Sequence, residues 1–368
     1  MIKSSKILTP KEIENRFSII RTLMAIGIAL ILALGLIMTV SDNPIKDFTT
    51  LLIGPLTRTS RMVTVISKMI PLLFTGVAVS LIYSAGQINI AAEGAFFAGS
   101  VAATIVALIP GIPSVPHIIL CISAGAVVGA LVMGIPGLLY VKYDTVTIVS
   151  ALMMNYVALY GGLYIILNPL RDPAAGFEAS FLFQESAKLP KLFGDERIHI
   201  GLIIGILIVI FGAMILQKRP FGYEIRTVGS NPKFAKYSGI AVEKTILYTS
   251  LLAGAIAGIG GTVETLGNYS RFVYSGFTNH GWDGIMIAVL CKNNPKYVPI
   301  AAFFVAYLKT SADTLNMTSK IPPEIISVIQ AIIIIFIAAE RFLSGWEHRK
   351  IVENAQTIIG MEGDVKSE

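Results

Sequence analysis

Long apolar segments, separated by short polar ones, constrain this sequence more than any other feature. Of its 368 residues, 54% are hydrophobic and only 14% are charged. Such a chain has too few polar side chains to cover a water-soluble globule, whereas a helix of roughly 20 apolar residues crosses a bilayer. We therefore expect an all-α polytopic membrane protein.

The apolar segments predict about ten membrane-spanning helices. They are 22–40, 61–83, 96–109 with the broken stretch 84–94 before it, 117–140, 145–168, 198–217, 246–267, 282–291, 297–309 and 324–339. Segments 282–291 and 297–309 are each too short to cross comfortably. They are either two shortened spans or a re-entrant pair buried among longer helices, and in the second case eight crossings remain.

The distribution of charge predicts that the N- and C-termini are both cytoplasmic. Residues 1–21 carry five basic and two acidic side chains, and 218–244 carries six basic and two acidic ones. Cytoplasmic connections are rich in Lys and Arg, so both segments are expected inside. Segment 169–197, with four basic and five acidic residues, suits the extracellular face. A transmembrane domain at 22–341 is thus expected between a cytoplasmic N-terminal segment and a cytoplasmic tail at 342–368.

The cytoplasmic loop 218–244 contains the signature of a very short helix. Ser230 and Asn231 are good N-cap residues, and Pro232 suits the first helical position, where no N–H is needed. Residues 233–238 make barely two turns before Gly239, which can adopt the left-handed conformation that ends a helix. A helix this short is unstable alone in water, so it must dock on something.

The faces of this short helix suit a protein groove. Phe234 and Tyr237 lie three residues apart, with lysines beside them. The alternative is an ordinary cytoplasmic loop whose lysines only set the topology. The residue pattern alone favours neither reading.

Polar side chains inside the apolar segments are costly in a bilayer, so they are expected to face protein or a water-filled path. Those that form the candidate substrate pathway are Gln87, Asn89, Glu93, Asn155, Tyr156, Glu264 and Asp283. Alternatively, Glu93 has a structural role: its carboxylate lies at a helix start and accepts from the backbone N–H groups of the broken stretch 84–94. Asn155 has a structural alternative too, in which its side chain forms a hydrogen bond between two spans.

Several chemistries lack their sequence signature. There is no phosphate-binding loop of the GxxxxGK[ST] type and no HExxH, GxSxG or CxxC motif, so we expect no enzyme. The four histidines are scattered without metal-ligand spacing, and both cysteines fall in apolar runs. The positive charge clusters at segment ends, as membrane topology requires, and needs no nucleic-acid partner. GIGGTV at 258–263 lies within a predicted span, where close helix packing explains its glycines better than a dinucleotide does.

Four stretches, in order, resemble one family of membrane proteins. They are QINIAAEG at 87–94, LMMNYVALY at 152–160, RTVGSNPKFAKYSGI at 226–240 and GWDGIMIAVLCKNNP at 281–295. The chain is similar, over roughly residues 60–341, to permease subunits of ATP-binding-cassette importers. The branch is the one that includes branched-chain amino acid, simple-sugar and nucleoside permeases. The resemblance is closest to the nucleoside permeases that work with basic-membrane-protein-type lipoproteins.

The resemblance implies a role for the short helix and a set of partners. The helix would couple the permease to a separate ATPase subunit through Arg226, Gly229, Ser230, Asn231, Pro232, Phe234, Ala235, Tyr237 and Gly239. The implied partners are ATPase subunits, a second permease that is a copy or a paralogue, an extracellular solute-binding lipoprotein and membrane lipid. ATP and magnesium would be bound by the ATPase, and this chain would hold no cofactor and no metal. The implied location is the bacterial plasma membrane.

The implied function is import of a nucleoside or a simple sugar, and its direction rests on the resemblance alone. Val146 and Thr147 occupy positions where nucleoside relatives often carry Asn-Glu, and they lie close to Asn155. This difference from the nucleoside relatives bears on which solute is transported and not on the class of transporter. The alternative function is an ion-coupled secondary carrier or a channel for a small polar solute.

Overall fold

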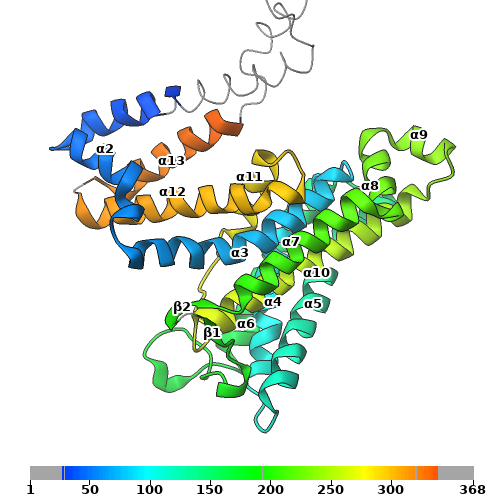
Figure 1. The fold of residues 1–368 in the computed structure, drawn as a ribbon. Coiled ribbons are helices and arrows are strands. Elements are labelled where there is room, and N and C mark those ends of the chain that lie inside the picture. The colour runs from blue at the N-terminus through cyan, green and yellow to red at the C-terminus, as the bar shows by residue number, and fades with distance from the viewer. Residues whose placement is uncertain (1–26, 29, 193, 320, 339–368) are drawn as a thin grey trace, which may run out of the picture. The chain divides into compact units, whose positions relative to one another are not determined.

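The computed structural model describes residues 27–28, 30–192, 194–319 and 321–338, and Figure 1 shows its helices. The predicted segments 1–21 and 342–368 lie outside the described residues. The chain divides into two compact units, one formed by 53–311 and the other by residues before 53 and after 311 in the sequence. We describe each unit by itself.

The larger unit is almost entirely helical. Its helices are α3 (Thr59–Ser84), α4 (Ala92–Ala107), α5 (Ser114–Tyr143), α6 (Thr147–Leu167), α7 (Gly201–Lys218), α8 (Pro220–Ser230), α9 (Pro232–Tyr237), α10 (Val242–Asn268), α11 (His280–Leu290) and the first part of α12 (Val298–Thr318). Short 3₁₀ turns lie at Gly54–Thr57, Pro173–Ala175, Glu185–Ala187 and Pro295–Tyr297. An antiparallel hairpin of β1 (Lys191–Leu192) and β2 (Asp195–His199) precedes α7.

The smaller unit contains the apolar helix Leu30–Val40, α2 (Pro44–Ile53), the end of α12 and α13 (Pro323–Ala338). The mixed polar stretch 41–60 between the predicted spans 22–40 and 61–83 is largely helical, because it contains α2. Pro44 supplies a favourable first helical residue, and Asp47 in the first turn complements the positive end of the helix. The Oγ of Ser41 donates to Asp47 Oδ2 at 2.6 Å, which fixes the entry to α2.

Five helices among the described residues are long and apolar enough to cross a membrane, namely α3, α5, α6, α7 and α10. The prediction that 297–309 is a short segment is wrong, because α12 runs on to Thr318. Polar side chains from Lys309 onward interrupt its hydropathy but not its helix. By contrast, α11 is indeed short, with 11 residues. The total of ten crossings and the cytoplasmic placement of the termini stay predictions.

Glycine faces bring α4, α5 and α10 together, and these helices lie side by side (Figure 1). A Cβ added at Gly258 of α10 would overlap the carbonyl oxygen of Gly125, and one at Gly129 of α5 would lie 2.7 Å from the Cα of Gly258. A Cβ at Gly99 of α4 would also overlap the backbone of Gly258. This confirms the close helix packing that the glycine spacing predicts, because only glycine allows backbones to approach so closely.

The connection between α6 and α7 covers the end of α10. The amide of Leu189 donates to the carbonyl of Leu266 at 3.1 Å, and Lys191 donates to the carbonyl of Gly267. The ring of His199, in β2, is fully buried against Gly267. These contacts satisfy carbonyls that the last turn of α10 leaves without a helical partner.

Replacing Gly258 tests the glycine packing. Gly258→Ala should lower the melting temperature of the detergent-solubilised protein markedly, because overpacking a rigid backbone contact costs about 1–3 kcal/mol or more. The matched control is Gly161→Ala on α6, where an added Cβ meets nothing within 4 Å. The control should melt at or slightly above the wild-type temperature. Equal stability of the two variants would contradict the packing.

The burial of His199 predicts a pH dependence of stability. Burial, reinforced by the nearby Lys191, lowers the pKa of His199 from 6.5 to about 4. The unfolded chain therefore binds a proton that the folded chain excludes, and stability should fall as pH decreases from about 6.5 to about 4. We expect the melting temperature to drop by a few degrees between pH 7 and pH 5. In His199→Gln, this drop should be smaller, and an unchanged drop would show that other groups cause it.

Candidate functional site

The chain breaks its helical path between α3 and α4, and buried amide side chains satisfy this break. Asn89 is fully buried; its Nδ2 donates to the carbonyl of Met133 in α5 at 3.0 Å, and its Oδ1 accepts from the amide of Ala91 at 3.0 Å. Gln87 accepts from Thr147 of α6 at 3.1 Å. Because non-helical backbone among packed helices needs such partners, Asn89 has a structural role, whereas Gln87 ties the break to the side chain of Thr147.

Asn155 of α6 ties the same break to a neighbouring helix. Its Oδ1 accepts from the amide of Gly94 at 2.8 Å, and its Nδ2 donates to the carbonyl of Ile90 at 3.1 Å. A side chain at Gly94 would not fit, because its Cβ would lie 2.7 Å from the Asn155 Oδ1. The buried amide thus makes the interhelical hydrogen bond that the sequence offered as one of two alternatives.

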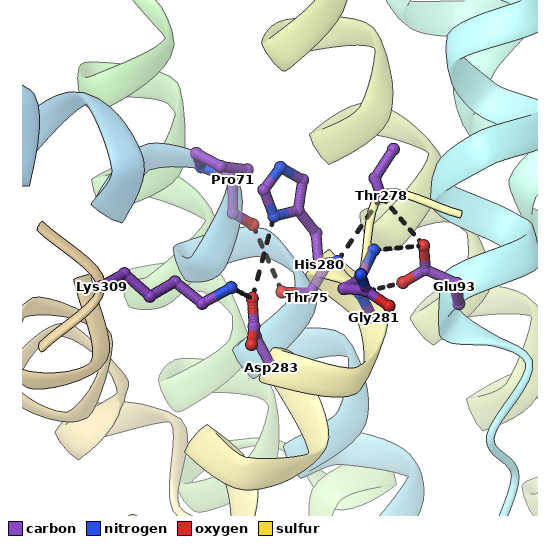
Figure 2. Close-up of polar contacts among 9 residues, drawn as sticks. Pro71, Thr75, Glu93, Thr278, His280, Gly281, Asp283 and Lys309 are labelled. Atoms are coloured by element: carbon purple, nitrogen blue, oxygen red, sulfur yellow. Dashed lines mark hydrogen bonds and ion pairs between the residues drawn. The ribbon is translucent and has the colours of Figure 1, made fainter. Parts of the chain in front are cut away.

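Glu93 binds the N-terminus of another helix. Its Oε1 accepts from Thr278 Oγ1 at 2.9 Å and from the Asn279 amide at 2.8 Å, and its Oε2 accepts from the Gly281 amide at 2.6 Å (Figure 2). The expectation that Glu93 satisfies its own break is therefore wrong. The start of α11 offers free N–H groups and the positive end of a helix dipole, which a carboxylate stabilises.

One turn further along α11, Asp283 pairs with Lys309 of α12 (Figure 2). The Nδ1 of His280 lies 3.9 Å from the same carboxylate oxygen, Asp283 Oδ2. Asp283 is almost fully buried, whereas Lys309 is about one-third exposed. An ion pair on an apolar pair of helices is costly to bury unless the partners stay together, so it fixes α11 to α12.

Glu264 lies in α10 and makes a different set of contacts. Its Oε2 accepts from Asn268 Nδ2 at 2.9 Å, and Asn268 Oδ1 accepts from Ser67 of α3 at 3.4 Å. The group holds the last turn of α10 against α3. Glu264 is buried and does not share a hydrogen bond with Glu93 or Asn155 among the described contacts.

Tyr156 differs from the other predicted pathway residues because its side chain is 46% exposed. The ring of Phe277 meets it edge-on at 5.5 Å, and Tyr160 stacks on it at 6.2 Å between centroids. Aromatic faces of this kind can stack with a ring-bearing solute. Of the seven predicted residues, Tyr156 is the most exposed; Gln87 is partly exposed and the other five are buried.

Sequence reasoning missed Lys309, His280 and Thr278 as partners in these contacts. Lys309 could have been found, because a lysine within an apolar segment needs an oppositely charged partner. The predicted segment, however, ends at this residue. Thr278 and His280 carry no comparable signal. Their role depends on where Glu93 and Asp283 lie in space.

A second candidate site is the short helix α9 with α8 before it. Asn231 caps α9 by accepting from the Phe234 amide at 3.1 Å, and Gly239 has a φ of +83°, as the pattern predicts. Ser230 is instead the last residue of α8, because the predicted loop is helical from Pro220. A Cβ at Gly229 would overlap the carbonyl oxygen of Ser84, so this glycine lets α8 cross the end of α3.

One side of α9 is anchored and the other is open. Ala235 is fully buried in a small cluster with Val228 and Ile246. Phe234 is 57% and Tyr237 is 92% exposed. The anchored side gives this six-residue helix the dock that its length requires, and the aromatic side is left available to a partner. Arg226 of α8 is also exposed.

Comparisons with known proteins agree with this architecture. Residues 61–338 match the family described as the permease component of the branched-chain amino acid transport system. The chain is 33% identical to the guanosine ABC transporter permease protein of Bacillus subtilis, with 76% of this chain and 82% of the relative covered. It is 30% identical to the nucleoside ABC transporter permease protein of Lactococcus lactis, with 92% of each covered. It is also 30% identical to the glucose ABC transporter permease protein of Haloferax volcanii, with 84% and 85% covered.

Replacing Glu93 tests its role at the start of α11. Glu93→Ala leaves three donors without an acceptor, and each unsatisfied buried group costs about 1–3 kcal/mol. We expect the melting temperature to fall in the order wild type, Glu93→Gln, Glu93→Ala, since the amide retains one acceptor oxygen. Glu185→Gln is the matched control, because the Glu185 side chain is 87% exposed. A wild-type melting temperature for Glu93→Ala would contradict the assignment.

Proposed function

The chain belongs to the family of permease components of branched-chain amino acid transport systems, and we propose that it imports a nucleoside as part of an ATP-binding-cassette transporter. A simple sugar is the second candidate solute. The names of the guanosine, nucleoside and glucose permeases among its relatives support these two classes. In this proposal the chain is the membrane-spanning subunit in a bacterial plasma membrane.

The observation that carries the proposal is the exposed aromatic side of an anchored α9. A helix of six residues, fixed through Ala235 and presenting Phe234 and Tyr237, fits a groove on an ATPase subunit. Because α9 is packed on α8 and α10, a movement of the ATPase would pass to the helices as a rigid-body motion. Arg226 and Gly229 would position α8 beneath it.

The proposed assembly contains parts that this chain does not supply. Two ATPase subunits bind ATP and magnesium, a second permease completes the membrane core, and an extracellular lipoprotein delivers the solute. The basic segment 218–244 faces the cytoplasm and the segment 169–197 faces outside, as their charges favour. The permease itself catalyses no reaction.

For the solute path, the contacts divide the predicted residues into two groups. Asn89, Glu93 and Asn155 bind backbone groups, Gln87 accepts from Thr147, and Glu264 and Asp283 pair with Asn268 and Lys309. We therefore assign them to the support of the path rather than to its surface. Tyr156 remains as the contact for a solute with an aromatic or planar ring.

The second candidate function is an ion-coupled carrier. The intramembrane pair Asp283–Lys309 is the observation that favours it, because such charges mark ion or proton paths in other transporters. Uptake of solute by the permease alone in liposomes, driven by an ion gradient without ATP, would support the carrier and overturn the importer.

Aspartate on the exposed aromatic side of α9 should abolish ATPase association. Phe234→Asp or Tyr237→Asp places a carboxylate where an apolar contact would form, and we expect loss of the copurifying ATPase subunit while the permease stays folded. The measurement is affinity purification from the native host in mild detergent, followed by mass spectrometry. The folded state is checked by the melting temperature, which an exposed substitution changes by little.

The matched controls are Phe234→Leu and Tyr237→Phe, which keep an apolar surface and should retain the ATPase. Retention of the ATPase by the two aspartate variants would refute the role of α9 in coupling. Recovery of the wild-type chain alone, reproducibly and at low salt, would refute the importer as a whole.

A further inference from the structure

The connection between α10 and α11, residues 269–279, is held by the segment 168–200 at its first end. The amide of Ser180 donates to the carbonyl of Phe272 at 3.1 Å, and the amide of Phe272 donates to Ser180 Oγ at 3.0 Å. The amide of Phe183 donates to the carbonyl of Ser270 at 2.9 Å. We call 269–279 the strap. Its first half is thus hydrogen-bonded to Ser180 and Phe183 of another loop.

A partly buried ion pair adds to this attachment. Arg271 donates to Asp172 Oδ2 at 3.1 Å, and both side chains are at most one-fifth exposed. The guanidinium of Arg271 also lies over the ring of Phe177, 5.9 Å from its centroid. Since a partly buried charged pair is screened less than a surface pair, it resists separation more strongly.

The middle of the strap is stiffened by aromatic rings. Phe272 is buried and meets Phe97 of α4 edge-on at 5.6 Å, and Tyr274 meets both Phe272 at 5.2 Å and Tyr269 at 5.4 Å. Packed rings have few alternative arrangements. Residues 269–274 of the strap are therefore held in one arrangement against α4.

The last end of the strap is held by Glu93. Thr278 and Asn279, its final residues, both donate to the Glu93 carboxylate, and the next helix follows at once. Asn279 has a φ of +63°, and its carbonyl accepts from the amide of Asp283 at 3.0 Å. The strap thus ends on the residue that starts α11, one turn before the Asp283–Lys309 pair.

We infer that the strap transmits the docking of the extracellular solute-binding protein from segment 168–200 to α11, with Arg271 and Asp172 as positioning residues. This inference rests on the proposed importer function. Segment 168–200 carries exposed Phe177, Phe181 and Leu182, which give a partner protein an apolar surface to press on. A push on segment 168–200 would displace the first half of the strap, to which it is hydrogen-bonded. The last residues of the strap lie at the start of α11, which Glu93 of α4 and Lys309 of α12 hold.

The test compares ATP hydrolysis with and without the binding protein. The complete assembly that copurifies with this chain is placed in lipid nanodiscs, and guanosine and glucose are supplied in turn. The variants are Asp172→Arg, Arg271→Asp and the double variant with the two charges exchanged. Glu185→Arg is the matched control, because it reverses an exposed charge on the same segment that makes no described contact with the strap.

We expect each single variant to lose stimulation by the binding protein about fivefold or more, the size of a typical coupling between sites, with unchanged basal hydrolysis. The exchanged pair should recover most of the stimulation, and Glu185→Arg should keep all of it. Recovery by the exchanged pair distinguishes positioning from a general loss of folding. Hydrogen exchange of peptides from 269–283 in the same samples should be faster in the single variants and normal in the exchanged pair.

Two negative outcomes are distinguishable. Full stimulation in both single variants, beside faster exchange in 269–283, would overturn the strap and leave the importer standing. Absence of any stimulation in the wild-type assembly, or absence of an ATPase from it, would overturn the importer and the inference that rests on it.

Discussion

The contact on which the rest of this structure depends is the backbone-to-backbone approach of α10 to α5 and α4 at Gly258, Gly125 and Gly99. In a bilayer the hydrophobic effect does not hold helices together, because lipid is as apolar as a leucine side chain. Dispersion forces between closely packed backbones take its place. A Cβ at any of these positions would overlap a neighbouring backbone. The three helices therefore form a fixed frame from which α6 and α11 can be positioned.

The helical path is broken between α3 and α4, and polar side chains satisfy the backbone groups of that break. Asn89 and Asn155 provide the carbonyl and amide groups of the break with partners, and Glu93 provides the start of α11 with an acceptor. Three of the polar residues that the sequence marks as unusual within apolar segments thus satisfy backbone groups, and three others pair with side chains. Tyr156 is different because its ring stays exposed beside Phe277. Residue type alone does not separate these two roles.

Helix α9 also has one side that is packed on the protein and one side that is exposed. Ala235 is buried and keeps the helix in place, whereas Tyr237 is almost fully exposed and Phe234 is more than half exposed. A partner that buries these two aromatic rings would explain their exposure on so short a helix. For this reason we connect α9 with an ATPase. The strap at 269–279 is likewise attached at both ends, to Asp172 of segment 168–200 through Arg271 and to Glu93 of α4 through Asn279.

The sequence by itself determined the membrane class, the short helix from Pro232 with its Asn231 cap and Gly239 stop, and the close packing of the glycines at 258–263. These features depend on composition, local spacing and backbone conformation, which neighbours along the chain decide. Only the tertiary structure decided that Glu93 holds α11 and that Lys309 pairs with Asp283, because the partners lie 26 to 188 residues apart. Helical continuity at 220–230 and beyond Lys309 was also missed, since packing there outweighs the polar pattern. A buried polar group must find some partner, but the fold alone decides which one is within reach.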